Sequence, residues 1–180
     1  MSALFQNYAR RPIAIEKGQG TIVYDTNGKK YLDFTSGIAV CSLGHANPII
    51  VNAIQQQSEK LWHISNLFES PGQEKLASSI VKDLHLSHVF FCNSGAEANE
   101  AAIKLARKHT GKHHIIVFEK SFHGRTFGAM SATGQDKVRK GFGPLVSQFT
   151  TLPYNDVEAL KAAIDDSSRV KIIMAGRPVL

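Results

Sequence analysis

Short apolar segments alternate with helical patterns along the second half of this chain, and that alternation limits the possible folds most. Strands are expected at residues 88–92, at 115–118, around Phe149 and at 170–174, with helices at about 95–109 and 156–165. Such alternation is typical of β-α-β units, whose strands lie parallel in one sheet covered by helices. The sequence therefore predicts an α/β fold with a largely parallel sheet, interrupted by a glycine-rich polar stretch at 119–143.

The first part of the chain shows a different sequence pattern. Residues 20–34 form two apolar segments on either side of Asn27-Gly28, which is a strong signal for a β-hairpin turn. Apolar residues then recur with helical spacing over 49–62 and again over 73–84. We therefore expect residues 1–60 to be an N-terminal arm or small-domain segment, and residues 61–180 to be the start of a large, incomplete α/β domain.

Charge and cysteine usage exclude several classes of protein. The net charge is +6, but the basic residues are scattered and accompany no nucleic-acid-binding motif, so their densest runs are expected on solvated faces. Cys41 and Cys92 are far apart and form no metal-binding pattern, which favours a reducing compartment. No signal peptide or 18-residue apolar stretch occurs. We expect a cytoplasmic protein without a metal, a nucleic-acid partner or a membrane partner.

The first candidate site lies at residues 93–100, between an expected strand and an expected helix. Ser94 and Glu97 have the spacing of a capping box, in which each side chain accepts from the other residue's amide. Gly95 would let an anion approach the free amides at the start of the helix. The residues alone leave two alternatives open, a phosphate cradle or simply a well-capped helix. No P-loop lysine and no GxGxxG pattern occurs.

The second candidate site is the segment 119–126, which also follows an expected strand. Ligands of open α/β sheets bind at the carboxyl ends of strands, so this segment and residues 93–97 could line one crevice. Arg125 could grip a carboxylate with two parallel hydrogen bonds, or form a surface ion pair. Phe122 could contact a planar ring or pack in the core. His123 could be a satisfied polar histidine.

With these residues in view, the chain resembles the class III pyridoxal-phosphate-dependent aminotransferases, and most closely their acetylornithine-specific members. The resemblance runs from Tyr8 to about Met174 and rests on many motifs in order. They are Gly18-Gln19-Gly20, residues 25–28, Tyr31 to Phe34, Ser36 to Val40, Leu43-Gly44-His45, residues 91–100, Lys104 to Arg107, Ser121 to Thr126, Thr133-Gly134 and Pro153 to Asp156. An ordered series of this kind is far more specific than any one motif.

This resemblance implies a fold type I enzyme, a homodimer in which each active site is built from both subunits. It implies that Ser94, Gly95 and Ala96 bind the phosphate of pyridoxal 5'-phosphate (PLP). Phe122 is implied to lie against the pyridine ring and Arg125 to bind a substrate carboxylate.

Two residues of the N-terminal part are also implied in substrate binding. Tyr8 resembles an arm aromatic near the substrate. Ile38 stands where ornithine aminotransferases tend to carry tyrosine, which would leave room for an acylated side chain.

The implied reaction transfers an amino group between N-acetylornithine and 2-oxoglutarate, in arginine biosynthesis. The substrates are thus small amino acids and 2-oxo acids. Two alternatives remain at this point. One is another class III ω-aminotransferase, acting on ornithine, succinylornithine or 4-aminobutyrate. The other is a non-catalytic, truncated product.

The family's cofactor-bound lysine and its pyridine-nitrogen aspartate are expected beyond residue 180. We therefore assign no catalytic residue and expect the fragment by itself to be inactive. Arg177 stands where the family carries a glutamate before Pro178-Val179, so that active-site position departs from the pattern.

Overall fold

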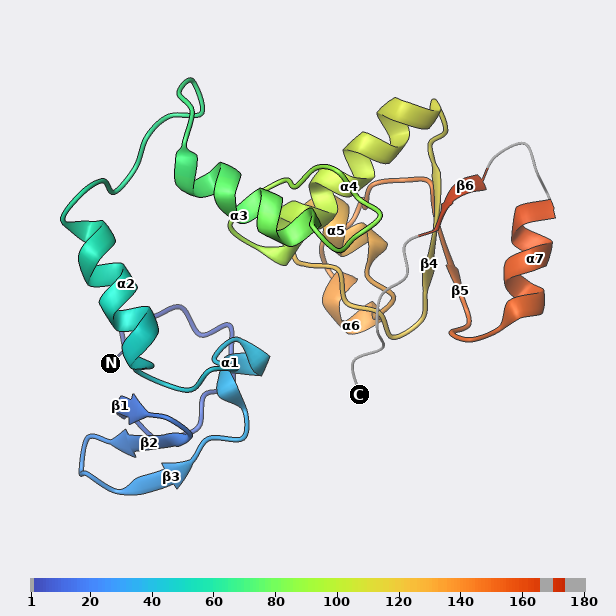
Figure 1. Cartoon of the computed structure of the whole chain (residues 1–180). Helices are drawn as coiled ribbons and strands as arrows, with labels where there is room; N and C mark the ends of the chain where they lie inside the picture. Colours follow the sequence, from blue (N-terminus) through green and yellow to red (C-terminus); the bar gives the residue numbers. More distant parts are fainter. Residues whose placement is uncertain (1, 166–169, 174–180) are drawn as a thin grey trace. The chain divides into compact units, whose positions relative to one another are not determined.

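The computed structural model describes residues 2–165 and 170–173. The chain divides into two compact units, Met1–Glu74 and Lys75–Leu180, and each is considered by itself. Figure 1 traces the elements of both. The expectation for Arg177, Pro178 and Val179 lies outside the described residues.

The first unit contains an antiparallel sheet of three strands, β1 (Ile15–Gln19), β2 (Ile22–Asp25) and β3 (Lys30–Leu32), in that order. The predicted hairpin is confirmed as β2–β3. Gly28 adopts a φ of 78° in its turn, and the Asp25 carboxylate accepts the amides of Asn27 and Lys29, both at 2.9 Å. Strand β1 was not predicted, because apolar and polar residues alternate only weakly along it. It pairs with β2 through a β-bulge.

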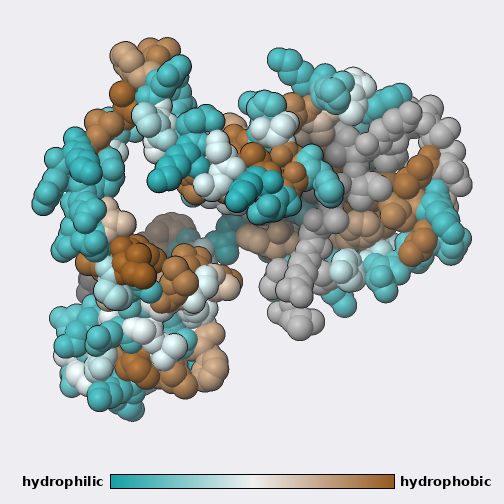
Figure 2. Space-filling view, in the orientation of Figure 1, coloured by the Kyte–Doolittle hydropathy of each residue, from teal (hydrophilic) through white to brown (hydrophobic). Residues whose placement is uncertain are grey.

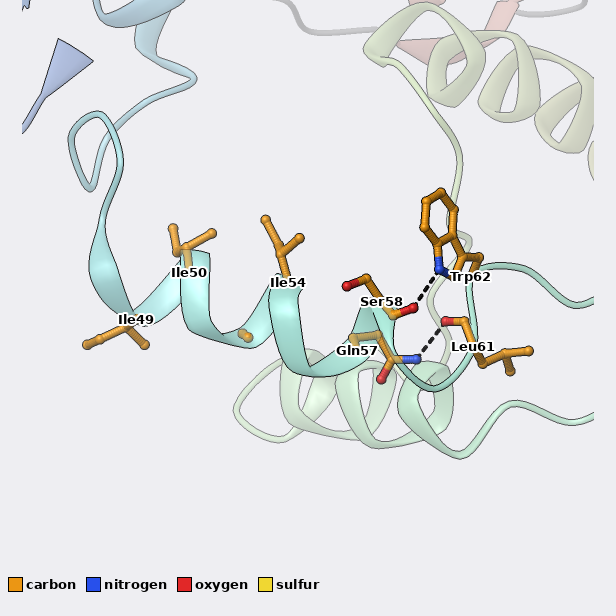
Figure 3. A pocket seen from close by; sticks show the side chains of 8 residues that line it. Ile49, Ile50, Ile54, Gln57, Ser58, Leu61 and Trp62 are labelled. Atoms are coloured by element: carbon orange, nitrogen blue, oxygen red, sulfur yellow. Dashed lines mark hydrogen bonds between the residues drawn. The ribbon is translucent and has the colours of Figure 1, made fainter. Parts of the chain in front are cut away.

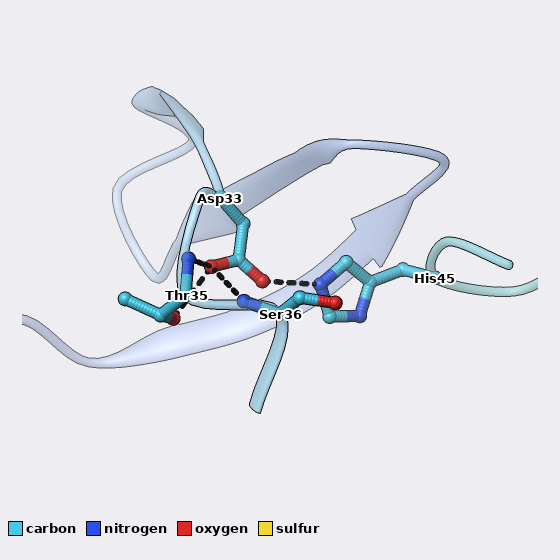
Figure 4. A network of polar contacts seen from close by, with 4 residues as sticks. All are labelled: Asp33, Thr35, Ser36 and His45. Atoms are coloured by element: carbon cyan, nitrogen blue, oxygen red, sulfur yellow. Dashed lines mark hydrogen bonds and ion pairs between the residues drawn. The ribbon is translucent and has the colours of Figure 1, made fainter. Parts of the chain in front are cut away.

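Beyond β3, one carboxylate organises the backbone. Asp33 Oδ1 accepts the amides of Thr35 and Ser36, both at 3.0 Å, and the Thr35 hydroxyl at 2.7 Å. Asp33 Oδ2 lies 2.8 Å from His45 Nε2 (Figure 4). The bonds from the Thr35 hydroxyl and from His45 hold the pKa of Asp33 well below its usual range. The short element α1 (Ser36–Ala39) follows directly.

This lowered pKa predicts that acid destabilises the first unit. An unfolded aspartate titrates near pH 3.9, so the stabilisation from charged Asp33 is complete above about pH 4 and is lost as the pH falls toward the folded pKa. Melting temperatures by circular dichroism at pH 6 and pH 3 should therefore differ less in Asp33→Asn than in the parent chain. An unchanged difference would contradict the prediction. Some loss should persist in the variant, because the amide of Lys29 and other bonds lower the pKa of Asp25 too.

Two helices follow, α2 (Pro48–Ser58) and α3 (Pro71–Val81). Asn47 caps α2 by accepting the amide of Ile49 at 3.0 Å, and proline at the first helical position suits that start. The predicted helix ran on to residue 62, because its apolar spacing continues to Leu61. The chain instead leaves the helix after Ser58, whose carbonyl accepts the indole N–H of Trp62 at 2.6 Å.

The second unit is built on a parallel sheet. Strand β4 (His114–Phe118) lies between β5 (Phe149–Leu152) and β6 (Val170–Ile173) and runs parallel to both. Ile115, Ile116 and Val117 are fully buried. Helix α4 (Gly95–Thr110) adds Ile103 to a cluster with Ile115 and Val117, and α7 (Val157–Asp165) connects β5 to β6. The predicted α/β fold with a parallel sheet is confirmed.

The predicted strand at residues 88–92 was wrong, and two short helices were not predicted. Residues 88–92 form no strand, and Phe90 is 70% exposed, because these residues have no paired neighbour within the part of the chain that the structure describes. The glycine-rich polar stretch 119–143, for which no element was predicted, contains α5 (Phe127–Ala132) and α6 (Asp136–Arg139). These helices are too short for their apolar periodicity to be detected.

Candidate functional site

The start of α4 combines a capped helix with open space. Ser94 is the extended N-cap residue, and its Oγ accepts the amide of Glu97 at 3.2 Å, as predicted. The Glu97 carboxylate accepts the amide of Asn93 at 2.7 Å, one residue earlier than the predicted partner. The side chain and amide of Asn93 lower the pKa of Glu97, which therefore stays charged at neutral pH.

Two backbone donors are left at this helix end. The amides of Gly95 and Ala96 have no hydrogen-bond partner among the described residues. A Cβ placed on Gly95 would meet no heavy atom within 4 Å, so nothing blocks the approach to its amide. Free amides and the positive end of the helix dipole together attract an anion. The donor set fits a phosphate group.

The loop after β4 contributes the second group of predicted residues. Its backbone is held from inside the unit: the buried Ser121 Oγ accepts the amide of Gly134 at 3.1 Å, and Thr133 Oγ1 accepts the amide of His123 at 3.0 Å. The Phe122 side chain stays 42% exposed, and Arg125 is exposed as well. The aromatic ring and the guanidinium are thus displayed on a firmly held backbone.

His123 differs from the other residues of this loop. Its side chain is 5% exposed, and burial lowers its pKa, so the ring is neutral near pH 7. Its backbone is satisfied, but Nε2 has no hydrogen-bond partner among the described residues. The prediction of a satisfied histidine therefore holds for the backbone and fails for this ring nitrogen.

Helix α4 and this loop lie side by side, although no strand precedes α4 as the prediction of a shared crevice had assumed. The Asn99 side chain donates to the carbonyl of His123 at 2.5 Å. Glu100 Oε1 accepts the amide of Ala129 at 2.9 Å and also the hydroxyl of Thr126. A Cβ on Gly124 would lie 2.7 Å from Ala96 Cβ, so glycine is needed for this approach.

Asn99 and Glu100 were absent from the predicted site residues. Glu100 stands four residues before Lys104, a spacing that is typical of an ion pair along one helix face. Its partners instead lie 26 and 29 residues away in the sequence, so no local spacing could indicate them.

Removing the Glu100 carboxylate should destabilise the contact between α4 and the start of α5. Glu100→Ala leaves the start of α5 without its acceptor, and the expected loss is about 1–2 kcal/mol of unfolding free energy. Urea denaturation followed by circular dichroism measures it. Glu119→Ala, which removes an exposed carboxylate from the same loop region, should change stability by less than about 0.5 kcal/mol. Equal effects of the two variants would contradict a linking role for Glu100.

The other two predicted residues belong to the first unit. Tyr8 lies before β1 and is 53% exposed, whereas Ile38 lies in α1 and is 92% exposed. Ser94, Gly95, Ala96, Phe122 and Arg125 all belong to the second unit.

An apolar hollow of about 580 Å³ lies elsewhere in the first unit, along α2 (Figure 3). Its lining includes Ile50, Ile54 and Trp62, and exposed aliphatic residues such as the isoleucines appear as brown patches in Figure 2. The side-chain amide of Gln57 is already bonded to the carbonyl of Leu61 at 2.8 Å. The hollow offers no charged side chain for a carboxylate or phosphate, so it is not the candidate site.

None of the helices within residues 2–165 and 170–173 is long and apolar enough to cross a membrane. Over the same residues, no three His, Cys, Asp or Glu side chains gather as a metal site would require. The thiols of Cys41 and Cys92 are free.

Comparison with known proteins decides the family. The sequence model of the family described as aminotransferase class-III matches residues 5–175. The chain belongs to the class III aminotransferases. The predicted resemblance is thereby confirmed.

Named relatives of this class III aminotransferase agree with that assignment. An acetylornithine aminotransferase of Bacillus anthracis is 58% identical over 166 residues, which are 92% of this chain and 43% of the relative. The chain thus spans less than half the length of that relative.

Two solved structures share its fold. An N-acetylornithine aminotransferase of Stenotrophomonas maltophilia is 38% identical with a TM-score of 0.72, over 88% of this chain and 40% of the other. An ornithine aminotransferase of Toxoplasma gondii, with PLP partially occupying its active site, is 32% identical with a TM-score of 0.85, over 91% and 40%. The class III family and the PLP-bound structure imply this cofactor for the fold.

Proposed function

We propose that this chain supplies the cofactor-phosphate site of an aminotransferase that moves an amino group between N-acetylornithine and 2-oxoglutarate. The observation that carries the proposal is the open start of α4, with the free amides of Gly95 and Ala96 beside a loop that displays an aromatic ring and a guanidinium. Because the chain belongs to the class III aminotransferases, we infer that the anion bound here is the phosphate of PLP.

The residues of the second unit match the parts of PLP. The Ser94 hydroxyl and the amides of Gly95 and Ala96 would hold the phosphate, because a helix N-terminus favours negative charge. The half-exposed Phe122 ring would lie against the pyridine. When bound, PLP supplies an electron sink that allows a proton to move between carbon atoms. The contribution of these residues is binding and orientation.

Substrate recognition is proposed for three residues. The guanidinium of Arg125 is suited to hold a carboxylate by two parallel bonds, which a lysine could not do equally well. Tyr8 would contribute an aromatic surface. Ile38 would leave room for the acetyl group, because its apolar side chain is shorter than tyrosine and offers no hydroxyl.

Ornithine is the second candidate substrate. The fold similarity to the Toxoplasma gondii ornithine aminotransferase, with a TM-score of 0.85, supports it. The 58% identity to an acetylornithine aminotransferase supports the first candidate.

A completed enzyme separates the two. Residues 1–173 of this chain can be joined to the remaining part of the Bacillus anthracis relative, and the purified chimera assayed with both amino donors and 2-oxoglutarate. We expect a higher kcat/KM for N-acetylornithine, as in the intact relative assayed in parallel. Preferential use of free ornithine would select the second candidate. Loss of all activity in a folded chimera would contradict both.

The remaining expectations are proposed for the completed protein. We infer a cytoplasmic homodimer in which residues 1–60 form an arm and residues 61–180 begin the PLP-binding domain. Light scattering coupled to size-exclusion chromatography should give the mass of two chimeric chains. The 180-residue chain by itself should show no transamination in the same assay.

A further inference from the structure

The element α1 is a left-handed turn rather than an ordinary helix. Ser36, Gly37, Ile38 and Ala39 have φ angles of 47°, 62°, 61° and 62°. For residues with a Cβ this region costs energy, and for a β-branched side chain such as Ile38 it is seldom populated. Four consecutive residues in this region, three of them with a Cβ, persist only where the surrounding structure holds them.

The bonds inside the turn do not account for this conformation. Ile38 donates to the carbonyl of Thr35 at 2.7 Å, and Val40 donates to the carbonyl of Ser36 at 2.8 Å. A right-handed turn offers equivalent bonds at lower cost, since the handedness is set by the Cβ atoms. The left-handed form therefore needs support from residues outside the turn.

Asp33 and His45 provide that support from the two sides of the turn in the sequence. Asp33 Oδ1 accepts the amides of Thr35 and Ser36, at 3.0 Å each, and so fixes the entry to the turn. Its other oxygen bonds to His45 Nε2 at 2.8 Å (Figure 4). The Asp33 side chain is only 12% exposed, so water competes little for these bonds.

His45 is itself fixed to the sheet of the first unit. Its amide donates to the carbonyl of Gly20 at 2.8 Å, and its carbonyl accepts the amide of Gly20 at 2.9 Å. Its ring lies so close to Gly18 that a Cβ there would be 2.7 Å from His45 Cγ. The histidine therefore connects the carboxylate to a rigid anchor.

We propose that Asp33 and His45 act as a clamp that keeps the 36–39 turn left-handed and thereby sets the position of Ile38. Both are positioning residues, acting on substrate choice through Ile38. This part rests on the proposed function, in which Ile38 contacts the acylated side of the substrate. The side chain of Ile38 is 92% exposed on the turn, so its position depends on the backbone rather than on packing around it.

Amide hydrogen exchange measured by NMR on the 180-residue chain tests the clamp directly. The amides of Val40 and Cys41, both bonded to the carbonyl of Ser36, report the turn. We expect Asp33→Asn and His45→Phe each to speed their exchange by about tenfold or more, since bonds to charged groups are among the stronger ones. The amides of β2 and β3 serve as the internal reference and should change much less.

A second substitution separates the clamp from general support of the fold. Ala39 is exposed, and glycine adopts positive φ without the cost of a Cβ. Ala39→Gly in the Asp33→Asn background should therefore restore much of the lost protection at Val40 and Cys41. Equal acceleration in the turn and in β2, or no recovery with Ala39→Gly, would overturn the proposal.

The chimera described above tests the consequence for specificity. There, Asp33→Asn should lower the kcat/KM ratio of N-acetylornithine to ornithine severalfold, and Ala39→Gly should partly recover it. An unchanged kcat/KM ratio in an active chimera would show that Asp33 and His45 do not act on substrate choice. Faster amide exchange at Val40 and Cys41 would still support the clamp itself. A chimera without activity refutes the proposed function, whereas the exchange result still decides the clamp.

Discussion

Gly134→Ala is expected to destabilise the second unit by about 3 kcal/mol, near the upper end of the usual cost of overpacking. A Cβ on Gly134 would lie 2.0 Å from the carbonyl oxygen of Phe118, which is backbone at the end of β4 and cannot rotate away. Gly134 is also bonded on both sides, by its amide to Ser121 Oγ at 3.1 Å and by its carbonyl to the amide of Lys120 at 2.8 Å. The loop that displays Phe122 would have to move.

Urea denaturation monitored by circular dichroism measures this loss. Gly72→Ala is the matched control, because a Cβ there meets nothing within 4 Å and its φ is ordinary. It should leave stability unchanged or slightly raised, since alanine is a better helix former than glycine. A loss below about 1 kcal/mol for Gly134→Ala would show that the β4 end and the following loop are more compliant than this packing indicates.

Gly95→Pro should weaken PLP binding by about 10- to 100-fold, the value of one hydrogen bond to a charged group. Gly95 is the first residue of α4, where proline is well accepted, and Ser94 has the extended φ and ψ of −156° and 159° that a residue before proline prefers. The substitution thus removes one amide donor while the helix is kept.

Gly95→Ala is the control for this experiment, because it keeps the amide and its Cβ has open space. Titration of PLP into the cofactor-free chimera, followed by absorbance, gives the affinity of each variant, and circular dichroism confirms that α4 remains folded. Equal weakening by alanine and proline would indicate crowding rather than a lost donor. Full affinity in both would remove the amide of Gly95 from the phosphate site.

Local patterns carried most of the fold prediction. The Asn27-Gly28 turn, the buried strand Ile115 to Phe118 and the helix that begins after Ser94 each follow from residues close in sequence, because turn geometry, strand burial and capping are short-range effects. The same reasoning failed at residues 88–92. Apolar composition permits a strand there, but a strand also needs a paired neighbour.

The same distinction between short-range effects and long-range contacts applies to the candidate site. The sequence by itself predicted the cap at Ser94, which the structure confirms, and it named Gly95, Phe122 and Arg125 as candidate binding residues, which stay a prediction. Only the tertiary structure decided how the two segments are joined, through Asn99 and Glu100, and why Gly124 is required against Ala96. It also decided that Ser36 to Ala39 turn left-handed between Asp33 and His45. Capping and turn formation depend on neighbours a few residues away, whereas these contacts depend on which distant backbone atoms the fold brings within hydrogen-bonding distance.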